Sequence, residues 1–582
     1  MKFLEPEYEP GELIPNIALM MERNEARFRN KIVFAEKQDN EFKGITWEQL
    51  LRNARTIAVH LSEEYGFGKG DKMVIYSPNR LQMLELELAV MSMGGISVPI
   101  FAWFGKETAE LLIRHSDTSF LAVGGYLQLS RISKQLPLKA IFSFDTVEDK
   151  SFQNLHQFSE LLSPVNHGKD VFDYNAQPDD ICLNMYTSGT MGIPKCVQLT
   201  HGNILSQQAA LEVTWKLDEN DRFLSYLPWH HSFGGIFERF TAFYSGATMY
   251  LESGYGKDPK TILENWKHVS PTLFFSVPKV YQSLTELTKV SKQAEELFFH
   301  SGLKFIFTAA ASLPENISKE FTKRGIPVIE GWGLTETSPC CTLTDPKLER
   351  QPGVVGKPIP GVHIRLAEDG EIQVKGPNVM KGYYKNPEAN ASAFTGDGWY
   401  CTGDIGEITP LGLKLISRKD RIFKLSNGEK VIPTEMETII QGKCHYITFA
   451  MVVGGGKEYP VALLFPNKKN FEHPDYEVNP EGGCFCPRSL DELGRCLHGC
   501  LNDANCGLGQ KFAKIKYAMV IDDELSLEKN TLTPSMKPAM KNVTEAYKAH
   551  IENLYGAKHE VEEDVYVIKL DPQHIQTGKA EV

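Results

Sequence analysis

The stretch Tyr186–Lys195 reads Y-T-S-G-T-M-G-I-P-K and brings three hydroxyl side chains, two glycines and a lysine together. Hydroxyl groups and exposed backbone N–H groups donate hydrogen bonds, glycine allows the backbone to close around an anion, and lysine supplies positive charge. These properties together predict a loop that binds a polyphosphate. The candidate phosphate ligands are Thr187, Ser188, Gly189, Thr190, Gly192 and Lys195.

The segments on both sides of this loop read as strands. Ile181–Tyr186 is apolar, and apolar residues alternate after the loop from Cys196, so that a helix is expected to begin only near Thr200. A Walker loop requires the spacing G-x-x-x-x-G-K-[ST] between a strand and a helix. The spacing here excludes it. An ordinary turn rich in serine and glycine is the alternative, which the density of hydroxyl, glycine and lysine residues disfavours.

Length and composition predict a soluble protein of several domains. The 582 residues exceed one core, and 42% hydrophobic with 23% charged residues is typical of soluble globular chains. A net charge of -12 without a long basic run argues against a nucleic-acid partner. The N-terminal residues turn acidic where a secretory signal would be apolar, and the most apolar stretch, 89–104, is too short for a membrane span. We expect a cytoplasmic protein without a transmembrane segment, and peripheral membrane contact stays open.

Strand-like and helical patterns alternate along most of the chain. Ile45–Glu64 and Asn79–Ser92 read as helices. The alternation predicts an α/β fold with largely parallel, buried sheets. After Val362, short strands separated by glycine turns predict a small β-rich subdomain. The expected strands of the α/β part are Lys72–Tyr76, Ile96–Ile100, Phe120–Val123, Ala140–Phe144, Ile181–Tyr186, Thr272–Ser276, Leu303–Thr308 and Val328–Glu330.

Five of the eleven cysteines crowd into one C-terminal region. The spacing C-x-C-x9-C-x3-C matches no standard zinc pattern, and a cytosolic setting disfavours disulfides. We interpret these cysteines as reduced thiols that are mostly structural, and their role stays open. They are Cys484, Cys486, Cys496, Cys500 and Cys506.

The order of strand, glycine-hydroxyl loop and strand, closed by Pro194 and Lys195, resembles the signature of the adenylate-forming superfamily. This superfamily includes acyl- and aryl-CoA synthetases, peptide-synthetase adenylation domains and beetle luciferases. The resemblance implies a large AMP-binding domain of stacked, mostly parallel α/β subdomains with a β-rich subdomain, and a small mobile α+β C-terminal domain. We expect the large domain at residues 1–418, its β-rich part near 340–418, and the swinging small domain at 419–582.

A second segment, Glu330–Pro339, reads E-G-W-G-L-T-E-T-S-P. Glycines beside a tryptophan would let a flat ring approach the backbone and stack, which suits adenine. The threonine that follows can bond a phosphate oxygen, and the glutamate is a hard oxygen donor suited to Mg²⁺. In the superfamily the matching glutamate coordinates Mg²⁺ together with the first threonine of the loop, here Thr187; a capped helix start without a ligand is the alternative. The candidates are Gly331, Trp332, Gly333, Thr335 and Glu336.

A third segment, Gly398–Asp404, reads as a strand that ends in a carboxylate. A carboxylate presents two acceptor oxygens, which suits the neighbouring hydroxyls of a ribose. An aspartate after glycine is otherwise an ordinary turn residue, so the assignment of Asp404 as the ribose ligand depends on the resemblance.

The stretch Leu415–Lys430 resembles the junction between the large and small domains of the superfamily. The resemblance places a nucleotide-contacting arginine at Arg418, the hinge at Asp420, and the region near the CoA thiol at Gly428 and Lys430. Many relatives carry lysine at the hinge, so the charge balance at Asp420 stays open.

Near the C-terminus, Asn530–Lys537 reads N-T-L-T-P-S-M-K. A single lysine is most often a solvated surface charge. The superfamily carries its adenylation lysine in a proline-containing loop close to the C-terminus, and long-chain acyl-CoA synthetases tend to show L-T-P-T-x-K. Lys537 fits that pattern, with Ser535 in place of the threonine, and Lys541 is the second choice.

The segment Leu227–Phe240 reads L-P-W-H-H-S-F-G-G-I-F-E-R-F and resembles the acyl-pocket motif of the superfamily. His231 occupies the position of its histidine and is also a catalytic candidate, with Trp229 and Phe237 as further pocket candidates. The apolar residues recur at helical spacing. This spacing is typical both of a helix that forms a wall of an acyl tunnel and of a helix that packs in the core, so both interpretations stay open. A peptide-synthetase pocket would usually place an aspartate here, so a fatty acid fits better than an amino acid.

The resemblance is strongest to long-chain fatty-acid CoA ligases. A carboxylate must be activated before it can be coupled to a thiol, and the α-phosphate of ATP provides that activation. We therefore expect a fatty acid to react through acyl-AMP with CoA, with Mg²⁺ as cofactor and Lys195, Glu336 and Lys537 as catalytic residues. The small domain should rotate about Asp420 between the two steps. An acyl-AMP ligase that loads a carrier protein and a non-catalytic lipid-binding homologue stay open, as do acyl chain length and oligomeric state.

Overall fold

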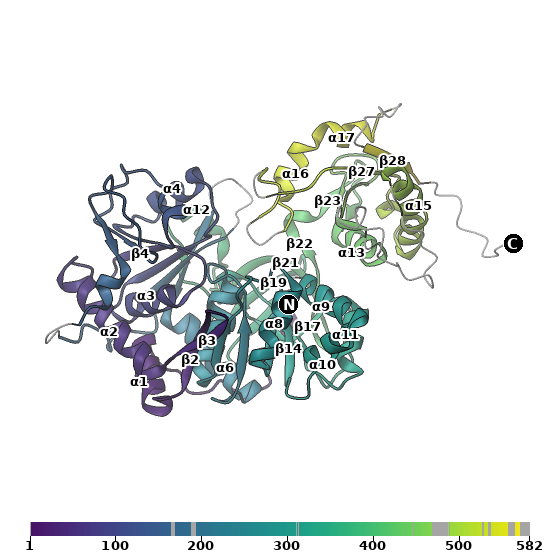
Figure 1. The fold of residues 1–582 in the computed structure, drawn as a ribbon. Helices are drawn as coiled ribbons and strands as arrows, with labels where there is room; N and C mark the ends of the chain where they lie inside the picture. The colour runs from purple at the N-terminus through teal and green to yellow at the C-terminus, as the bar shows by residue number, and fades with distance from the viewer. Residues whose placement is uncertain are drawn as a thin grey trace. The chain divides into compact units, whose positions relative to one another are not determined.

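The computed structural model of the chain describes residues 2–164, 169–187, 194–309, 311, 313–444, 446–467, 487, 489–526, 529–533, 537–556 and 565–570. The chain forms two compact units (Figure 1). Unit 1 consists of Met1–Glu368, Ile372–Thr402 and Ile408–Lys414, and unit 2 of Asp369–Glu371, Gly403–Glu407 and Leu415–Val582. The functional domain boundary between residues 418 and 419 stays a prediction.

An eight-stranded sheet in unit 1 has the order β20-β10-β9-β5-β4-β6-β7-β8. Its central strands run parallel, and β9, β10 and β20 add an antiparallel edge. This edge presents the hairpin that carries the glycine-hydroxyl loop. The strands are β4 (Lys72–Tyr76), β5 (Ile96–Ile100), β6 (Phe120–Val123), β7 (Ala140–Ser143), β8 (Leu155–Gln157), β9 (Ile181–Thr187), β10 (Lys195–Thr200) and β20 (Gly382–Tyr383).

A second sheet has the order β1-β18-β19-β21-β22-β17-β16-β15-β14-β13-β11-β12-β2-β3. The run from β15 to β2 is parallel, whereas the pairs formed by β16, β17 and β18 are antiparallel. Its strands are β1 (Lys2–Leu4), β2 (Ile32–Gln38), β3 (Glu41–Thr46), β11 (Arg222–Ser225), β12 (Thr248–Leu251), β13 (Leu273–Ser276), β14 (Phe305–Thr308), β15 (Val328–Trp332), β16 (Thr342–Leu343), β17 (Val354–Pro358), β18 (His363–Leu366), β19 (Glu371–Lys375), β21 (Tyr400–Thr409) and β22 (Gly412–Arg418).

Helix α3 lies between the two sheets of unit 1, because it contacts both β5 and β2. It is apolar on nearly all sides, as expected of an enclosed helix. The helices and helical turns of unit 1 are α1 (Ile17–Phe28), α2 (Trp47–Glu63), α3 (Leu81–Ser92), α4 (Lys106–His115), α5 (Tyr126–Leu129), η1 (Phe158–Leu162), α6 (His201–Trp215), η2 (Phe233–Glu238), α7 (Arg239–Ser245), α8 (Pro259–Val269), α9 (Pro278–Val290), α10 (Lys292–Phe298), α11 (Glu315–Thr322), η3 (Thr335–Thr337) and α12 (Pro387–Ala393).

Unit 2 contains a four-stranded sheet with the order β25-β26-β27-β28. Alternate residues of its strands pack against two separate cores, since successive side chains of a strand point to opposite faces. One core includes α13 and α15, and the other includes α16 and α17. The elements are η4 (Lys419–Arg421), β23 (Phe423–Lys424), β24 (Lys430–Val431), α13 (Pro433–Lys443), β25 (Ile447–Val453), β26 (Val461–Pro466), α15 (Leu490–Gly507), η6 (Lys511–Ala513), β27 (Tyr517–Ile521), α16 (Met540–Ala546), α17 (Lys548–Asn553) and β28 (Val565–Lys569).

The structure confirms the α/β fold class and the strands expected before Thr187 and after Lys195. Helix α6 begins at His201, where Thr200 and Asn203 cap it reciprocally. One expectation is wrong: Asp404 does not end a strand, because β21 continues to Thr409. No helix of the described residues is long and apolar enough to cross a membrane.

Candidate functional site

The hairpin β9–β10 places Thr187 and Lys195 directly opposite each other. Side chains of directly opposed residues point to the same face of a sheet. The Thr187 hydroxyl donates a hydrogen bond of 3.4 Å to the carbonyl oxygen of Lys195. The first hydroxyl and the lysine of the loop therefore share one face at the base of the hairpin. The other candidates of the loop, Ser188, Gly189, Thr190 and Gly192, lie outside the described residues.

Tyr383 connects the lysine of the first segment with the glutamate of the second. Lys195 Nζ lies 4.8 Å from the centroid of the Tyr383 ring, and the Tyr383 hydroxyl donates a hydrogen bond of 2.8 Å to Glu336 Oε1. The same hydroxyl lies 3.4 Å from that of Tyr400. Sequence reasoning missed Tyr383, because its place follows only from the pairing of β20 with β10, which sets Tyr383 opposite Val197.

The donors gathered here suit a Mg²⁺ ion that is bound mainly by phosphates. Mg²⁺ in nucleotide sites is usually held by one or two carboxylates together with substrate phosphates. Glu336 is a buried carboxylate, and Thr187 offers a hydroxyl oxygen. Within the described parts of the chain, no group of three or more His, Cys, Asp or Glu side chains could hold a metal ion by itself. The residues present thus fit an ion that arrives with ATP.

The acyl motif and the second segment meet through their hydroxyl groups. Ser232 Oγ lies 3.0 Å from Thr335 Oγ1, so the residue after His231 contacts the residue before Glu336. The backbone N–H of Phe233 donates to His231 Nδ1 at 3.3 Å, which places the proton of a neutral His231 ring on Nε2. The predicted acyl and magnesium residues therefore belong to neighbouring parts of unit 1.

The glycines of the second segment are required by the packing of the chain itself. A Cβ on Gly331 would lie 2.6 Å from the Phe307 ring, and one on Gly333 would lie 1.7 Å from the carbonyl oxygen of Pro339. Trp332 is only 7% exposed. The alternative of a capped helix start without a ligand also has support, since the backbone N–H of Leu334 donates a hydrogen bond of 2.9 Å to Thr337 Oγ1. The role of Gly331, Trp332 and Thr335 in nucleotide binding stays a prediction.

Two of the three acyl-pocket candidates lie in the core of unit 1. Trp229 is fully buried, with its ring centroid 5.8 Å from that of Phe34 and 5.1 Å from the Arg239 guanidinium. The Phe237 ring lies 4.7 Å from Phe307. These contacts favour the core reading of Phe237, and the pocket assignment stays a prediction.

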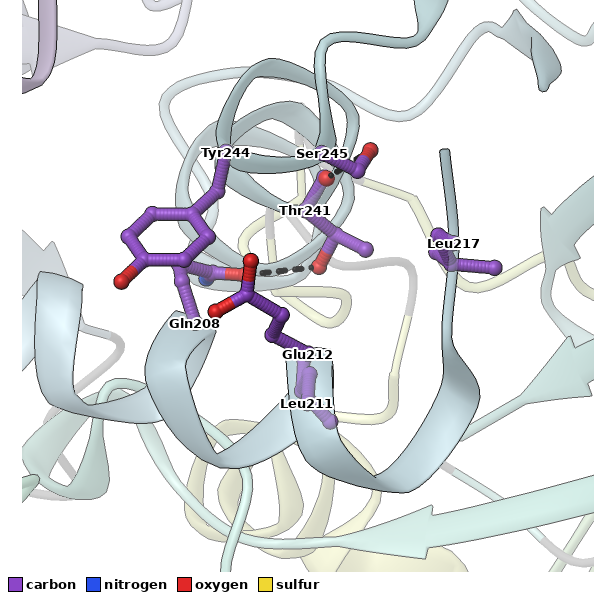
Figure 2. Close-up of a pocket in the computed structure, with 7 residues that line it drawn as sticks. All are labelled: Gln208, Leu211, Glu212, Leu217, Thr241, Tyr244 and Ser245. Carbon is purple, nitrogen blue, oxygen red and sulfur yellow. Dashed lines mark hydrogen bonds between the residues drawn. The ribbon is translucent and has the colours of Figure 1, made fainter. Parts of the chain in front are cut away.

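A small pocket lies between α6 and α7 (Figure 2). Two of its lining residues are joined by a hydrogen bond of 3.0 Å from Thr241 to Gln208 Oε1, and the space has room for about one water molecule. None of the predicted site residues lines it. Its lining residues are Gln208, Leu211, Glu212, Leu217, Thr241, Tyr244 and Ser245.

Four predicted site residues, Asp404, Arg418, Asp420 and Lys537, lie close together within unit 2. Arg418 Nη1 lies 3.0 Å from Asp404 Oδ1 and its Nε lies 3.8 Å from Asp420 Oδ1. Lys537 has exposed surface, yet the protein around its ammonium group lowers its pKa. Arg418 also lowers the pKa of Lys537 and Asp404 opposes this change, so both charges act on Lys537. Lys541, the second choice, lies on α16.

Lys419 anchors the predicted hinge, and sequence reasoning missed it. Its ammonium group pairs with Asp369 at 2.7 Å and with Glu371 at 2.8 Å. Hydrogen bonds from Lys419 to both carboxylates raise the pKa of Lys419 above its ordinary value. The side chain next to Asp420 is therefore tied to the turn after β18 through Asp369 and to the first residue of β19 through Glu371.

The CoA-region candidates lie at the hairpin β23–β24. Gly428 has a φ of +86°, a conformation that favours glycine, and its N–H donates to the carbonyl oxygen of Leu425 at 2.9 Å. Lys430 pairs with Lys424 across the hairpin. A contact of these residues with CoA stays a prediction. In the cysteine region, Cys496, Cys500 and Cys506 lie on α15, whereas Cys484 and Cys486 lie outside the described residues.

Comparison with known proteins gives matches along most of the chain. The family model described as AMP-binding enzyme matches residues 21–384, and that described as AMP-binding enzyme C-terminal domain matches residues 420–559. The chain is 28% identical to long-chain-fatty-acid–CoA ligase 6 of Homo sapiens over 83% of this chain and 78% of that protein. It is 27% identical to fatty acyl-CoA synthetase A of Dictyostelium discoideum over 90% and 87% of the two chains.

Among solved structures, the fold is similar to that of o-succinylbenzoate coenzyme A synthetase from Bacillus subtilis in complex with AMP. The TM-score is 0.71 at 22% identity, and the match covers 95% of this chain and 100% of that chain. At this level of identity the likeness concerns the fold.

Proposed function

The chain belongs to the family of AMP-binding enzymes, and we propose that it is a CoA ligase that activates a fatty acid. The acid reacts with ATP to give acyl-AMP and pyrophosphate, and CoA then displaces AMP to give acyl-CoA. The observation that carries this proposal is the convergence of Lys195 and Glu336 on Tyr383. The two curated relatives, whose names refer to fatty-acid CoA ligation, support the choice of acid.

In the first step the carboxylate attacks the α-phosphorus of ATP in line, and negative charge accumulates on the phosphate oxygens. Thr187 and Glu336 would hold Mg²⁺, which neutralises part of this charge when bound. Lys195 faces the same region from the base of the hairpin. Its ammonium group stabilises the departing pyrophosphate by charge.

Lys537 supplies the second positive charge of this step. Asp404 accepts from the ribose hydroxyls and Arg418, which pairs with it, contacts the nucleotide. In unit 2 both residues act electrostatically on Lys537. The second step needs a thiol at the acyl carbonyl, so we propose that the small domain rotates about Asp420 and brings Gly428 and Lys430 toward CoA.

A single assay tests the proposal. ATP-dependent consumption of CoA is measured with saturated acids of increasing chain length, and ATP–pyrophosphate exchange is measured in parallel. We expect thioester formation with fatty acids and little with acetate. Exchange without CoA consumption would instead indicate a ligase that loads a carrier protein. Absence of exchange with every acid would indicate a non-catalytic lipid-binding homologue.

A further inference from the structure

Two loops of unit 1 present aromatic side chains that touch each other at the surface. Trp103 follows β5 and is 39% exposed, and Tyr255 follows β12 and is 37% exposed. Their ring centroids lie 6.2 Å apart. Single exposed apolar residues are ordinary, whereas large contiguous apolar patches mark interaction sites, so this pair needs further observations to be assigned a role.

The loop of Trp103 is held from within. The carbonyl oxygen of Ala102 accepts a hydrogen bond of 3.0 Å from the buried Gln128 amide. The carbonyl oxygen of Phe104 accepts a hydrogen bond of 3.0 Å from Arg131 and a second hydrogen bond from the hydroxyl group of Tyr76, a buried residue. The backbone on both sides of Trp103 is therefore fixed, and its exposed ring belongs to a rigid turn.

The loop of Tyr255 is also held from within, because it folds around the buried carboxylate of Glu252. Glu252 accepts hydrogen bonds from the N–H groups of Gly254 at 2.7 Å and Gly256 at 2.6 Å. Tyr255 has a φ of +55°, a left-handed conformation that is unfavourable for a bulky residue. Such conformations persist only where the surroundings impose them, and they concentrate at functional sites.

An aromatic contact path leads from this surface to the predicted acyl motif. The Trp103 ring lies 5.4 Å from Phe101, and Phe101 lies 4.8 Å from the ring of His230, which precedes His231. Burial lowers the pKa of His230 to about 3, with a smaller contribution from His231. The His230 ring is therefore neutral at physiological pH, and the path carries no charge of its own.

Two cations act on the aromatic rings, and one of them, Arg80, is already paired with Asp145 at 2.9 Å. Lys257 Nζ lies 5.1 Å from the Trp103 ring. Among the described residues Lys257 pairs with no carboxylate, since its contacts consist of this cation–π interaction and a backbone N–H bond to Gly254. Glu36, Glu252 and Asp145 also act on Tyr255, so Lys257 is the positive charge here that has no carboxylate partner among the described residues. Two exposed rings beside this cation suit a ligand with a long hydrocarbon chain and a single negative charge.

We propose that Phe101, Trp103, Tyr255 and Lys257 bind the fatty acid at the surface, as the outer end of its route to His231. The hydrocarbon chain lies on the three rings, and Lys257 attracts the carboxylate. This inference rests on the proposed function, because it takes a fatty acid as the substrate. A membrane surface is the competing occupant of the same residues, and the test separates the two.

The first experiment measures binding in the absence of ATP and CoA. Palmitic acid brominated on its chain quenches nearby tryptophan, so it should quench the wild-type protein and quench Trp103→Phe much less. As a control, Trp266→Phe removes a buried tryptophan. The brominated acid should reduce the fluorescence of this variant by the same absolute amount as that of the wild type. Equal quenching in wild type and Trp103→Phe would overturn the proposal. Binding is read without catalysis, so this outcome is independent of whether the ligase reaction exists.

The second experiment tests the charge. Lys257→Met should weaken binding of palmitate several-fold at low salt and leave binding of hexadecanol unchanged, whereas Lys260→Met, which removes a neighbouring exposed lysine, should change neither. Equal weakening for the acid and the alcohol would contradict the role of Lys257.

The third experiment separates free acid from a membrane. Tyr255→Ala should raise the KM for palmitate about tenfold and leave the KM for ATP and for octanoate near wild type, with Tyr8→Ala as the exposed aromatic control. An effect on palmitate only when the acid is presented in phospholipid vesicles would show that the residues bind the membrane, and would overturn the proposal.

Discussion

The hydroxyl of Tyr383 donates a hydrogen bond of 2.8 Å to Glu336 Oε1, while its ring lies under the ammonium group of Lys195. One side chain thus orients the predicted magnesium ligand and contacts the predicted phosphate-binding lysine. Replacing the hydroxyl without replacing the ring separates these two roles.

Tyr383→Phe should lower kcat/KM for ATP about tenfold, because a hydrogen bond to a charged group contributes about 1.5 to 3 kcal/mol. Tyr384→Phe is the matched control, since Tyr384 is the next residue and its hydroxyl bonds Asp117 at 2.7 Å instead. Initial rates of pyrophosphate release at varied ATP measure both. If Tyr384→Phe were the more damaging change, the assignment would be wrong.

Lys537→Met should slow ATP–pyrophosphate exchange at least about 100-fold, as expected for loss of a charge that stabilises the transition state. Thioester formation from supplied acyl-AMP and CoA should continue, because that step does not need Lys537. Lys541→Met tests the second choice and should leave exchange within about twofold of wild type. A larger loss in Lys541→Met than in Lys537→Met would move the adenylation lysine to residue 541.

Asp420→Pro should block thioester formation and retain adenylation, because proline restricts the backbone about which the small domain is proposed to rotate. Asp420→Ala keeps the backbone free and should retain both half-reactions. The two half-reactions are measured separately by pyrophosphate exchange and by release of AMP from pre-formed acyl-AMP with CoA. Retention of both by the proline variant would remove Asp420 as the hinge.

Glu85 should make the protein less stable as the pH rises. Burial raises the pKa of Glu85 from its ordinary 4.5 to about 7, and a hydrogen bond from Asn53 opposes this. A raised folded-state pKa contributes stability that is complete below about pH 4.5 and is lost as the pH rises to about 7. The loss is at most about 3 kcal/mol.

The Tm of the wild type and of Glu85→Gln at pH 5 and pH 8 measures this dependence. The wild type should lose more stability than the variant between these two values, because glutamine cannot titrate. Equal losses in the two proteins would show that Glu85 does not titrate in this range.

The fold and the first segment could be predicted because their signals are local. The strand β9 is a short apolar run, apolar residues alternate in β10, and the start of α6 at His201 follows from the capping pair Thr200 and Asn203. The predicted strand end at Asp404 is wrong for the same reason: a local Gly-Asp pair is typical of a turn, but the chain continues as β21 and Gly403 adopts a φ of +71° within the strand.

The contacts between segments could not be predicted from local pattern. Tyr383 reaches Glu336 only because β20 pairs with β10, and Lys419 pairs with Asp369 on the turn before β19 and with Glu371 at the start of β19. Both depend on which strands become neighbours, and one sequence does not specify that pairing. For Gly331 and Gly333 the sequence pattern predicted contact with a ligand. The structure shows that the packing of the chain itself also requires glycine at both positions.

The most direct test of the central claim follows oxygen from the acid. Palmitate labelled with ¹⁸O in both carboxylate oxygens is incubated with the enzyme, ATP, Mg²⁺ and CoA, and the products are analysed by mass spectrometry. Activation through acyl-AMP predicts one ¹⁸O atom in the phosphate of AMP for each palmitoyl-CoA formed, with unlabelled pyrophosphate. Label in inorganic phosphate or pyrophosphate, or palmitoyl-CoA formed with unlabelled AMP, would contradict the account.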